Sequence, residues 1–193
     1  MKPPVKLDGR RERTKRTRAA IVGALTDLLD EGRIEPTAAE IAARAGVAVR
    51  SIAQHFASRE ELLLAVASHH VERLAHPAIR ENGSFDERLE AFVAARARSL
   101  EASSAMRRAA AVVLARSPSV ARALDDAARE RRKEAARFFS SEIAASSDAQ
   151  AAERAVALVG SGRTWDALRG EIGLGVKAAR EQLGFMLRAA LKR

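Results

Sequence analysis

Apolar residues recur every three or four positions along most of the chain, which is the spacing of amphipathic helices. An early stripe runs through Ile21, Leu25 and Leu28, and the last one runs through Leu183 and Leu187. Ala, Leu, Arg and Glu, which favour helices, are abundant, whereas aromatic residues make up only 4% of the sequence and Tyr is absent. The pattern therefore predicts an all-α protein.

Residues that cap helix N-termini mark where the predicted helices begin. Four Ser or Thr residues precede Glu or Gln at capping-box spacing, and one Ser precedes a Pro, namely Thr37, Ser58, Ser84, Ser147 and Ser117. Together with the apolar stripes they predict nine helices, four up to Pro77 and five after it. The predicted bounds are about 13–31, 49–56, 104–115 and 176–192, with the Ser147 helix interrupted at 160–162 and ending near 170.

Residues 37–56, TAAEIAARAGVAVRSIAQHF, have the pattern of a helix-turn-helix. Thr37 and Glu40 form the capping box of a first helix. Gly46 can adopt the positive φ that ends this helix, and Val47 supplies the apolar contact that turns the chain back. A second helix follows over about 49–56.

The second of these helices has two different faces. Ile52 and Phe56 are four residues apart and point toward the first helix, while Arg50, Ser51 and Gln54 point away. Arg can form two hydrogen bonds with guanine and Gln two with adenine, each such pair giving about 1–3 kcal/mol of discrimination. The helix is thus a candidate for the major groove of DNA. The alternative is a packing hairpin whose outer polar residues are merely solvated.

Residues 13–74 as a whole resemble the DNA-binding domain of the TetR/AcrR-type (tetracycline-repressor) family of bacterial transcriptional regulators. The resemblance rests on residues at fixed spacing: Ile21, Ala24, Leu25, Leu28, Gly32, Thr37, Ile41, Ala42, Ala45-Gly46-Val47, Ser51-Ile52, His55-Phe56 and Ser58-Arg59-Glu60-Glu61-Leu62. It implies a two-domain regulator, with a three-helix helix-turn-helix domain followed by a helical domain for ligand binding and dimerisation.

The resemblance also implies which residues meet DNA. These are Lys15, Arg18, Thr37, Ala48, Val49, Arg50, Ser51, Gln54, His55 and Arg59. Two positions depart from the family pattern, because Ala48 stands where Ser is common and Ala53 where an aromatic phosphate contact is common.

Positive charge is concentrated at the N-terminus. The formal net charge is +9, and residues 1–18 hold eight basic and two acidic residues, whereas residues 19–76 hold five basic and eight acidic residues. Such a balance favours a polyanionic partner. Pro3, Pro4 and Gly9 predict a flexible basic arm over 1–12, ahead of a DNA-binding domain over 13–60 and a second domain over 61–193. The arm can either lie along phosphates or remain a solvated tail.

The second domain contains candidate ligand and dimer contacts. The candidate pocket residues are Phe85, Phe92, Met106, Val112, Phe138 and Phe139. Each of them, taken singly, is also an ordinary core position. The C-terminal helices resemble the pair with which many family members dimerise, and the candidate interface consists of Val156, Val159, Trp165, Leu183, Met186 and Leu187. The alternative is that these helices only close their own core.

Other chemistries find little support in the sequence. There is no Cys, and His69, His70 and His76 do not have the spacing of a metal site. No nucleophile elbow, phosphate loop or dinucleotide motif is present, so neither an enzyme nor a cofactor is expected. No apolar run is long enough to span a bilayer and no signal peptide is evident, which predicts a cytoplasmic protein.

The sequence thus predicts a homodimeric DNA-binding regulator, most often a repressor, that binds a palindromic operator on double-stranded DNA and is released by a small-molecule effector. A helical ligand-binding or protein-interaction module without specific DNA binding is the alternative. The basic arm, Arg50 and Gln54 favour the first hypothesis, and Ala48 and Ala53 favour the second.

Overall fold

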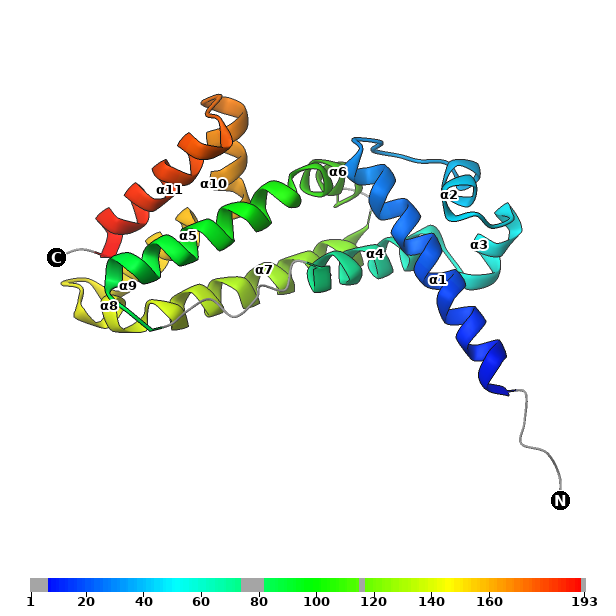
Figure 1. Ribbon diagram of the computed structural model, residues 1–193, viewed down its shortest axis with the longest axis horizontal. Helices are drawn as coiled ribbons and strands as arrows, with labels where there is room; N and C mark the ends of the chain where they lie inside the picture. The colour runs from blue at the N-terminus through cyan, green and yellow to red at the C-terminus, as the bar shows by residue number, and fades with distance from the viewer. Residues whose placement is uncertain (1–6, 74–81, 115–116, 192–193) are drawn as a thin grey trace, which may run out of the picture. The chain divides into compact units, whose positions relative to one another are not determined.

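The computed structural model describes residues 7–73, 82–114 and 117–191, and within them it contains eleven α-helices, one π-helical segment and no strand (Figure 1). The prediction of an all-α fold is confirmed, whereas the predicted count of nine helices is wrong. The helices are α1 (Leu7–Asp30), α2 (Ala38–Ala45), α3 (Val49–His55), α4 (Arg59–Arg73), α5 (Phe85–Ala102), α6 (Ser104–Leu114), α7 (Pro118–Phe138), α8 (Ser140–Ala145), α9 (Ala149–Val159), α10 (Gly162–Asp166) and α11 (Val176–Leu191), with the π-helical segment η1 (Ala167–Glu171) after α10.

The two additional helices arise from breaks that apolar spacing alone does not reveal. Helix α7 ends at Phe138, and Phe139 adopts φ −104° and ψ 23° before the short helix α8 begins. Helix α9 ends at Val159. A new helix, α10, begins after Ser161, whose hydroxyl accepts the Thr164 N–H at 3.2 Å and caps the helix. The predicted interruption at 160–162 therefore separates two helices.

Most of the predicted helix starts are confirmed. The capping boxes of Thr37 with Glu40 and of Ser84 with Glu87 are complete, and the Ser117 hydroxyl accepts the Val120 N–H at the start of α7. The Ser147 box is wrong by one residue, because the Asp148 carboxylate accepts the Ala151 N–H at 2.9 Å and caps α9 instead.

Two further starts differ from the prediction. At α4 the Ser58 hydroxyl accepts the Glu61 N–H, but the Glu61 carboxylate accepts the Ala57 N–H, so only half of a box forms. Helix α1 begins at Leu7 rather than Arg13, so the second half of the predicted arm is helical. One Gly costs a helix only about 1 kcal/mol, and Gly9 is followed by strong helix formers.

The chain divides into two compact units, which are described separately. Unit 1 comprises Met1–Arg73 and Ala105–Ala123, and unit 2 comprises Leu74–Ser104 and Leu124–Arg193. This differs from the boundary predicted after residue 60. The reason is that Leu62 and Val66 of α4 and Met106 of α6 are buried with the apolar stripe of α1.

Unit 1 is a helix-turn-helix built on α1. Ile21, Leu25 and Leu28 of α1 are buried together with Ile41 of α2 and Phe56, which follows α3. Arg44 of α2 forms two hydrogen bonds with the Glu31 carboxylate after α1, at 2.7 and 2.8 Å. The apolar core and this ion pair together fix the two short helices against α1.

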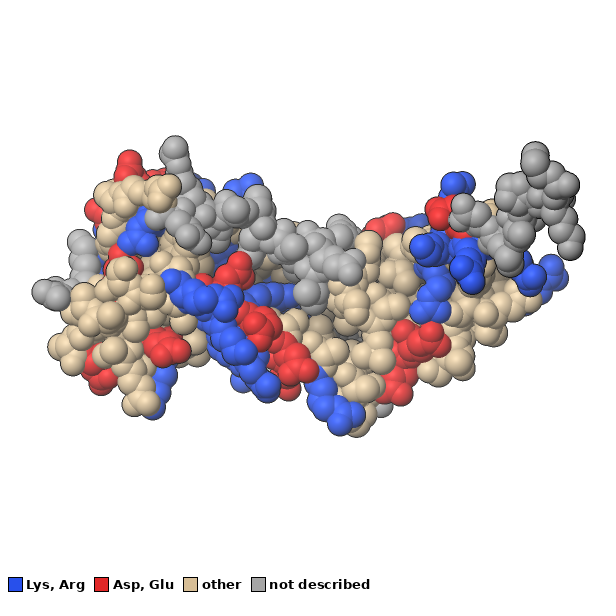
Figure 2. All heavy atoms as spheres, turned by 90° about the horizontal axis from the view of Figure 1, so that it is seen from below, with Lys and Arg blue, Asp and Glu red and all other residues tan. Residues whose placement is uncertain are grey.

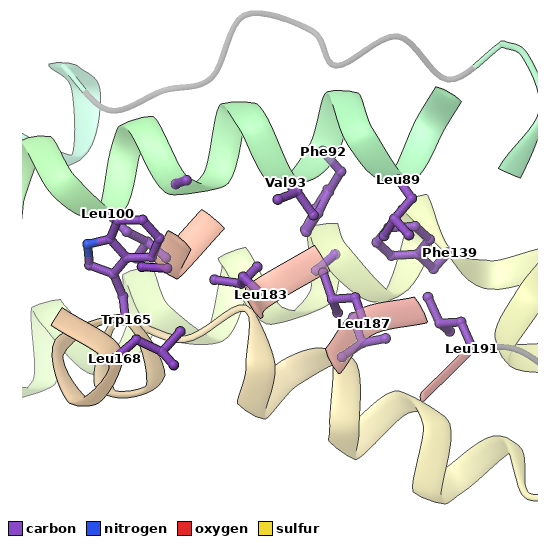
Figure 3. Packing of buried hydrophobic residues seen from close by; sticks show 14 residues of the cluster. Leu89, Phe92, Val93, Leu100, Phe139, Trp165, Leu168, Leu183, Leu187 and Leu191 are labelled. Atoms are coloured by element: carbon purple, nitrogen blue, oxygen red, sulfur yellow. The ribbon is translucent and has the colours of Figure 1, made fainter. Parts of the chain in front are cut away.

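Unit 2 has its own apolar core, formed mainly by α5, α9, α10 and α11. Leu89, Phe92 and Leu100 of α5 face Leu183 and Leu187 of α11 (Figure 3). Trp165, the single Trp of the sequence, is fully buried beside Leu100, and its indole N–H donates to the Glu101 carboxylate at 2.9 Å. The C-terminal helices are therefore part of the interior of this unit.

Some predicted features lie outside the described residues. They are the arm over 1–6, His76, the helix end at Pro77 and the side chains of His70 and Val112. Across the described part of the chain, no helix combines the length and the apolar character that crossing a bilayer requires.

Candidate nucleic-acid interface

Helix α3 presents its polar face to solvent. Arg50 and Gln54 are exposed, Ser51 is half-buried, and Val49 is 51% exposed at the start of the helix. This is the outward set that the sequence predicts. Ile52 on the opposite side is half-buried against the core of unit 1, so the predicted division of α3 into two faces is confirmed.

The turn before α3 fixes the direction in which this face points. Gly46 has φ 66° and ψ 32°, a left-handed conformation that strains a residue with a side chain. The Val47 N–H donates to the Ala42 carbonyl at 3.0 Å, which closes a Schellman-type end to α2. Helices α2 and α3 thus have the short, rigid connection of a helix-turn-helix.

The other predicted DNA contacts have mixed surroundings. Lys15 is exposed on the first turns of α1, and Thr37 is exposed while its hydroxyl caps α2. Arg59 is exposed, with its Nη1 donating to the Pro36 carbonyl at 3.3 Å. His55 is half-buried at the end of α3, where its carbonyl accepts from Arg18. Lys15, Thr37 and Arg59 therefore remain accessible to a partner.

Arg18 is placed differently from the expectation. Its guanidinium lies over the Phe56 ring, 4.1 Å from the centroid, and donates to the Glu61 carboxylate at 3.0 and 3.1 Å. Sequence analysis missed Glu61 as its partner, because 43 residues separate the two and no local pattern relates them. The structure thus joins Arg18 to the helix-turn-helix rather than leaving it extended into solvent.

Several acidic groups near α3 are already engaged within unit 1. The Thr37 N–H and hydroxyl hold the pKa of Glu40 below its ordinary value, and the Ala57 N–H, followed by Arg18, lowers that of Glu61. Both carboxylates therefore stay ionised in contact with donors. Lys and Arg side chains also cluster on the surface of α1 (Figure 2). Those of α1 from Arg10 to Arg16 are exposed.

Comparison with known proteins agrees with this geometry. The family model for bacterial regulatory proteins of the tetR family matches residues 27–66, which extend from the end of α1 to the middle of α4. The chain is a DNA-binding transcriptional regulator with a tetR-type helix-turn-helix. The helix-turn-helix of the regulator is accordingly a DNA-binding domain. No curated protein sequence matches this chain.

Solved structures share the fold over almost the whole length of the regulator. A transcriptional regulator from Rhodococcus sp. Rha1 is 20% identical with a TM-score of 0.73, and the match covers 90% of this chain and 95% of that one. A protein from Mesorhizobium loti MAFF303099, provisionally assigned to the TetR family, has 18% identity, a TM-score of 0.60 and coverage of 93% and 95%. The multidrug binding protein EbrR, solved with imidazole, has 21% identity, a TM-score of 0.54 and coverage of 88% of both chains.

The predicted pocket residues of the regulator do not form one group. Phe92, Phe138 and Phe139 meet in unit 2, with ring centroids 4.9–5.3 Å apart, and Phe85 packs beside them. Met106 instead belongs to the core of unit 1. Phe92 and Phe139 are buried, so their surroundings are those of core residues.

Four of the six predicted interface residues have no surface to offer to a partner. Val156, Trp165, Leu183 and Leu187 are at most 1% exposed within a single chain, because they form the core of unit 2. Val159 and Met186 are half-buried. The large exposed apolar residues of the same region are instead Leu158, Ile172, Val176 and Phe185. Leu158 on α9 and Phe185 on α11 lie opposite the buried stripes of their helices, and this position could have been found from the sequence.

Proposed function

We propose that this regulator is a homodimeric repressor that binds a near-palindromic operator and is released by a small molecule. The observation that supports DNA recognition is the exposed polar face of α3, with Arg50 and Gln54 on a rigid helix-turn-helix. Repression then follows from occlusion of a promoter, since a bound dimer covers DNA that the polymerase needs.

The chemistry of α3 supports base contacts in the major groove. Arg50 can donate two hydrogen bonds to O6 and N7 of guanine, and Gln54 can pair with N6 and N7 of adenine. Lys15, Thr37 and Arg59 are accessible around this helix and suit phosphate oxygens, which position the protein without selecting a sequence. Ala48, Val49, Ser51 and His55 complete the proposed contact surface.

A two-fold dimer fits the distribution of apolar surface in unit 2. Leu158 lies on the outer side of α9 and Phe185 on the outer side of α11, and they are 65% and 67% exposed. Small residues flank each of them, Ala151 and Ala155 on α9 and Ala178 and Ala189 on α11. Such faces allow close approach and a self-complementary four-helix contact. The interface we propose therefore uses Leu158 and Phe185 in place of the buried residues.

A dimer fixes the form of the operator. Two copies of α3 must enter successive major grooves about 34–36 Å apart, so each half-site repeats the other in inverted order. Selection of bound sequences from a random DNA pool at physiological salt tests this directly. We expect an inverted repeat with that spacing. Retention of DNA without any preferred sequence would overturn the proposal.

The same selected site tests the role of Arg50. We expect Arg50→Ala to relax the preference at one base pair of each half-site by about 1–3 kcal/mol, because the substitution removes a bidentate pair of hydrogen bonds. Arg59→Ala should weaken binding to all sequences alike, because a phosphate contact is independent of sequence. Equal losses on every sequence for Arg50→Ala would remove Arg50 from the base-contacting set.

The effector is proposed to bind in unit 2, next to the cluster of Phe92, Phe138 and Phe139. Phe138 is half-buried, so part of its side chain is accessible to a ligand. The imidazole complex of EbrR, a protein of the same fold, supports a small-molecule site in this architecture. Coupling must be reciprocal, so an effector that weakens operator binding tenfold is itself bound tenfold more weakly by the operator complex. Titration of candidate compounds, read by Trp165 fluorescence with and without operator, measures both factors.

A further inference from the structure

Arg18 lies where three helices of unit 1 meet. It belongs to α1, its Nη1 donates to the carbonyl of His55 at the end of α3, and both terminal nitrogens donate to Glu61 of α4. Its guanidinium also covers the ring of Phe56. One side chain thus contacts the residue that ends α3, the residue that follows it, and the helix beyond.

Glu61 extends this contact to the chain between α3 and α4. One carboxylate oxygen accepts from Arg18, and the other accepts the Ala57 N–H at 2.8 Å. Charge-assisted hydrogen bonds of this kind are about twice as strong as neutral ones, and a planar guanidinium can stack and donate at the same time. Lysine has the charge but not this combination of donors and stacking surface.

Helix α3 depends on such external support. It has only seven residues, none of them is buried, and Ala48 provides no side-chain cap at its N-terminus. Isolated helices of this length are unstable in water, so the packing and hydrogen bonds at its ends set its orientation. The positive charge of Arg18 near the C-terminal carbonyls of α3 also interacts favourably with the helix dipole.

We propose that Arg18 is a positioning residue for α3, and not a phosphate contact. It fixes the end of the recognition helix through His55, Phe56 and Glu61, so that it controls discrimination between DNA sequences more than affinity for DNA in general. The inference rests on the proposed base contacts of α3. It assigns to Arg18 a role in specificity through residues that need not touch a base.

Two substitutions and two measurements distinguish these roles. The Kd values of the full-length protein for its selected operator and for a scrambled duplex are measured across a series of salt concentrations. Their ratio gives discrimination, and the slope of log K against log salt falls by about 0.9 for each phosphate that the protein no longer neutralises. Arg18→Lys keeps the charge, and Arg18→Gln removes it. Circular dichroism confirms that each variant is folded.

For a positioning residue, both variants lower the ratio by about tenfold, the size of one good base contact, and leave the salt slope unchanged. For a phosphate contact, Arg18→Lys changes neither quantity, and Arg18→Gln reduces the slope by about 0.9 with the ratio intact. An unchanged ratio in Arg18→Lys, or a reduced slope with an unchanged ratio in Arg18→Gln, overturns the proposal. Lys15→Gln is the matched control on the same helix, expected to lower the slope and preserve the ratio.

Glu61→Gln provides an independent test that leaves Arg18 in place. Removal of the ion pair should lower the ratio, and the double variant with Arg18→Lys should lose less than the sum of the two single effects, because the residues act together. Additive losses would overturn the inference. If the unsubstituted protein binds the operator and the scrambled duplex equally, the proposed base contacts of α3 are wrong, and the inference about Arg18 falls with them. If the protein prefers the operator and Arg18→Lys keeps that preference, only the role of Arg18 is refuted.

Discussion

Ala48 is the N-cap residue of α3, and it leaves the first turn of this helix without a side-chain acceptor. Its backbone is already extended, with φ −71° and ψ 145°, as in helices that are capped by Ser or Thr. The position is also exposed, so a hydroxyl group would meet no steric obstacle from the core. A missing cap is therefore a local weakness that one substitution can repair.

We expect Ala48→Ser to stabilise the protein by about 1 kcal/mol, because the new hydroxyl can accept an N–H at the start of α3. Chemical denaturation followed by circular dichroism measures the change. Ala53→Ser is the matched control, since Ala53 is exposed within the same helix and a Ser there costs about 0.5 kcal/mol of helix propensity. Equal effects of the two substitutions would contradict the capping argument.

At the scale of single residues, local patterns predicted much of the helix-turn-helix. Thr37 with Glu40, Gly46 and the two faces of α3 follow from spacings of three and four residues, so the sequence is sufficient for them. The contact of Arg18 with Glu61 depends on how α1 crosses α4, which no local spacing encodes. The shift of the cap from Ser147 to Asp148 has another origin, because adjacent residues of similar capping strength compete.

At the scale of elements, α11 has two apolar sides with different roles. Leu183 and Leu187 are fully buried in unit 2, while Phe185 is 67% exposed on the opposite side. The spacing of apolar residues predicted the stripe of Leu183 and Leu187 correctly. It did not show that this stripe packs into the core of the same chain. The burial of the stripe leaves Phe185 as the large exposed apolar residue on this helix that the proposed dimer would use.

We expect Phe185→Ala to weaken self-association without unfolding the chain, because an exposed ring contributes to an interface and not to the core. Sedimentation equilibrium over a range of concentrations measures the dimer dissociation constant. Ile34→Ala serves as the control, since Ile34 is a large exposed apolar residue of unit 1. Unchanged association of the Phe185 variant would exclude the proposed face.

The start of α7 is joined to α4 by a second carboxylate. Glu60 accepts hydrogen bonds from the hydroxyls of Ser117, at 2.7 Å, and Ser119. The Ser119 hydroxyl, followed by that of Ser117, lowers the pKa of Glu60 from its ordinary value of 4.5. Because the pKa of Glu60 is lowered in the folded protein, the ionised carboxylate with its two hydrogen bonds stabilises the fold. This stabilisation is complete above pH 4.5 and is lost as the pH falls through the pKa of Glu60 in the folded protein.

Glu60→Gln should therefore reduce the free energy of unfolding at pH 7, and the difference from the unsubstituted protein should shrink as the pH falls below 4.5. Urea denaturation at several pH values measures the difference. Glu153→Gln is a suitable control, because Glu153 is exposed on α9 and the substitution should have a small effect throughout. A difference that is independent of pH would contradict the role of the ionised carboxylate.

At the scale of the whole molecule, charge is distributed unevenly. The exposed start of α1 is mainly basic, whereas Lys and Arg alternate with Asp and Glu along α7 (Figure 2). Arg129 and Lys133 of α7 each have an acidic neighbour within 4.0 Å, namely Asp126 and Glu130. The net charge of +9 is therefore less informative about DNA binding than the position of its basic residues.

Two triple substitutions to Gln with the same change in net charge test this distribution. Replacement of Arg10, Arg11 and Arg13 should reduce the slope of log K against log salt by as much as about 2.7, if each contacts one phosphate. Replacement of Arg129, Arg132 and Lys133 should leave the slope nearly unchanged. Similar slopes for both variants would mean that total charge, and not its place on α1, governs DNA binding.

The separation of the two faces of α3 has a consequence for how this protein can diverge. The residues that hold the helix lie on its inner side and at its ends, whereas Arg50 and Gln54 on its outer side are exposed. Substitutions at these outer positions can therefore change the proposed base contacts with little cost in folding. After a gene duplication, two copies could acquire separate sets of target promoters while they keep one scaffold. The same property makes the outer face of α3 a suitable place to engineer new operator specificities.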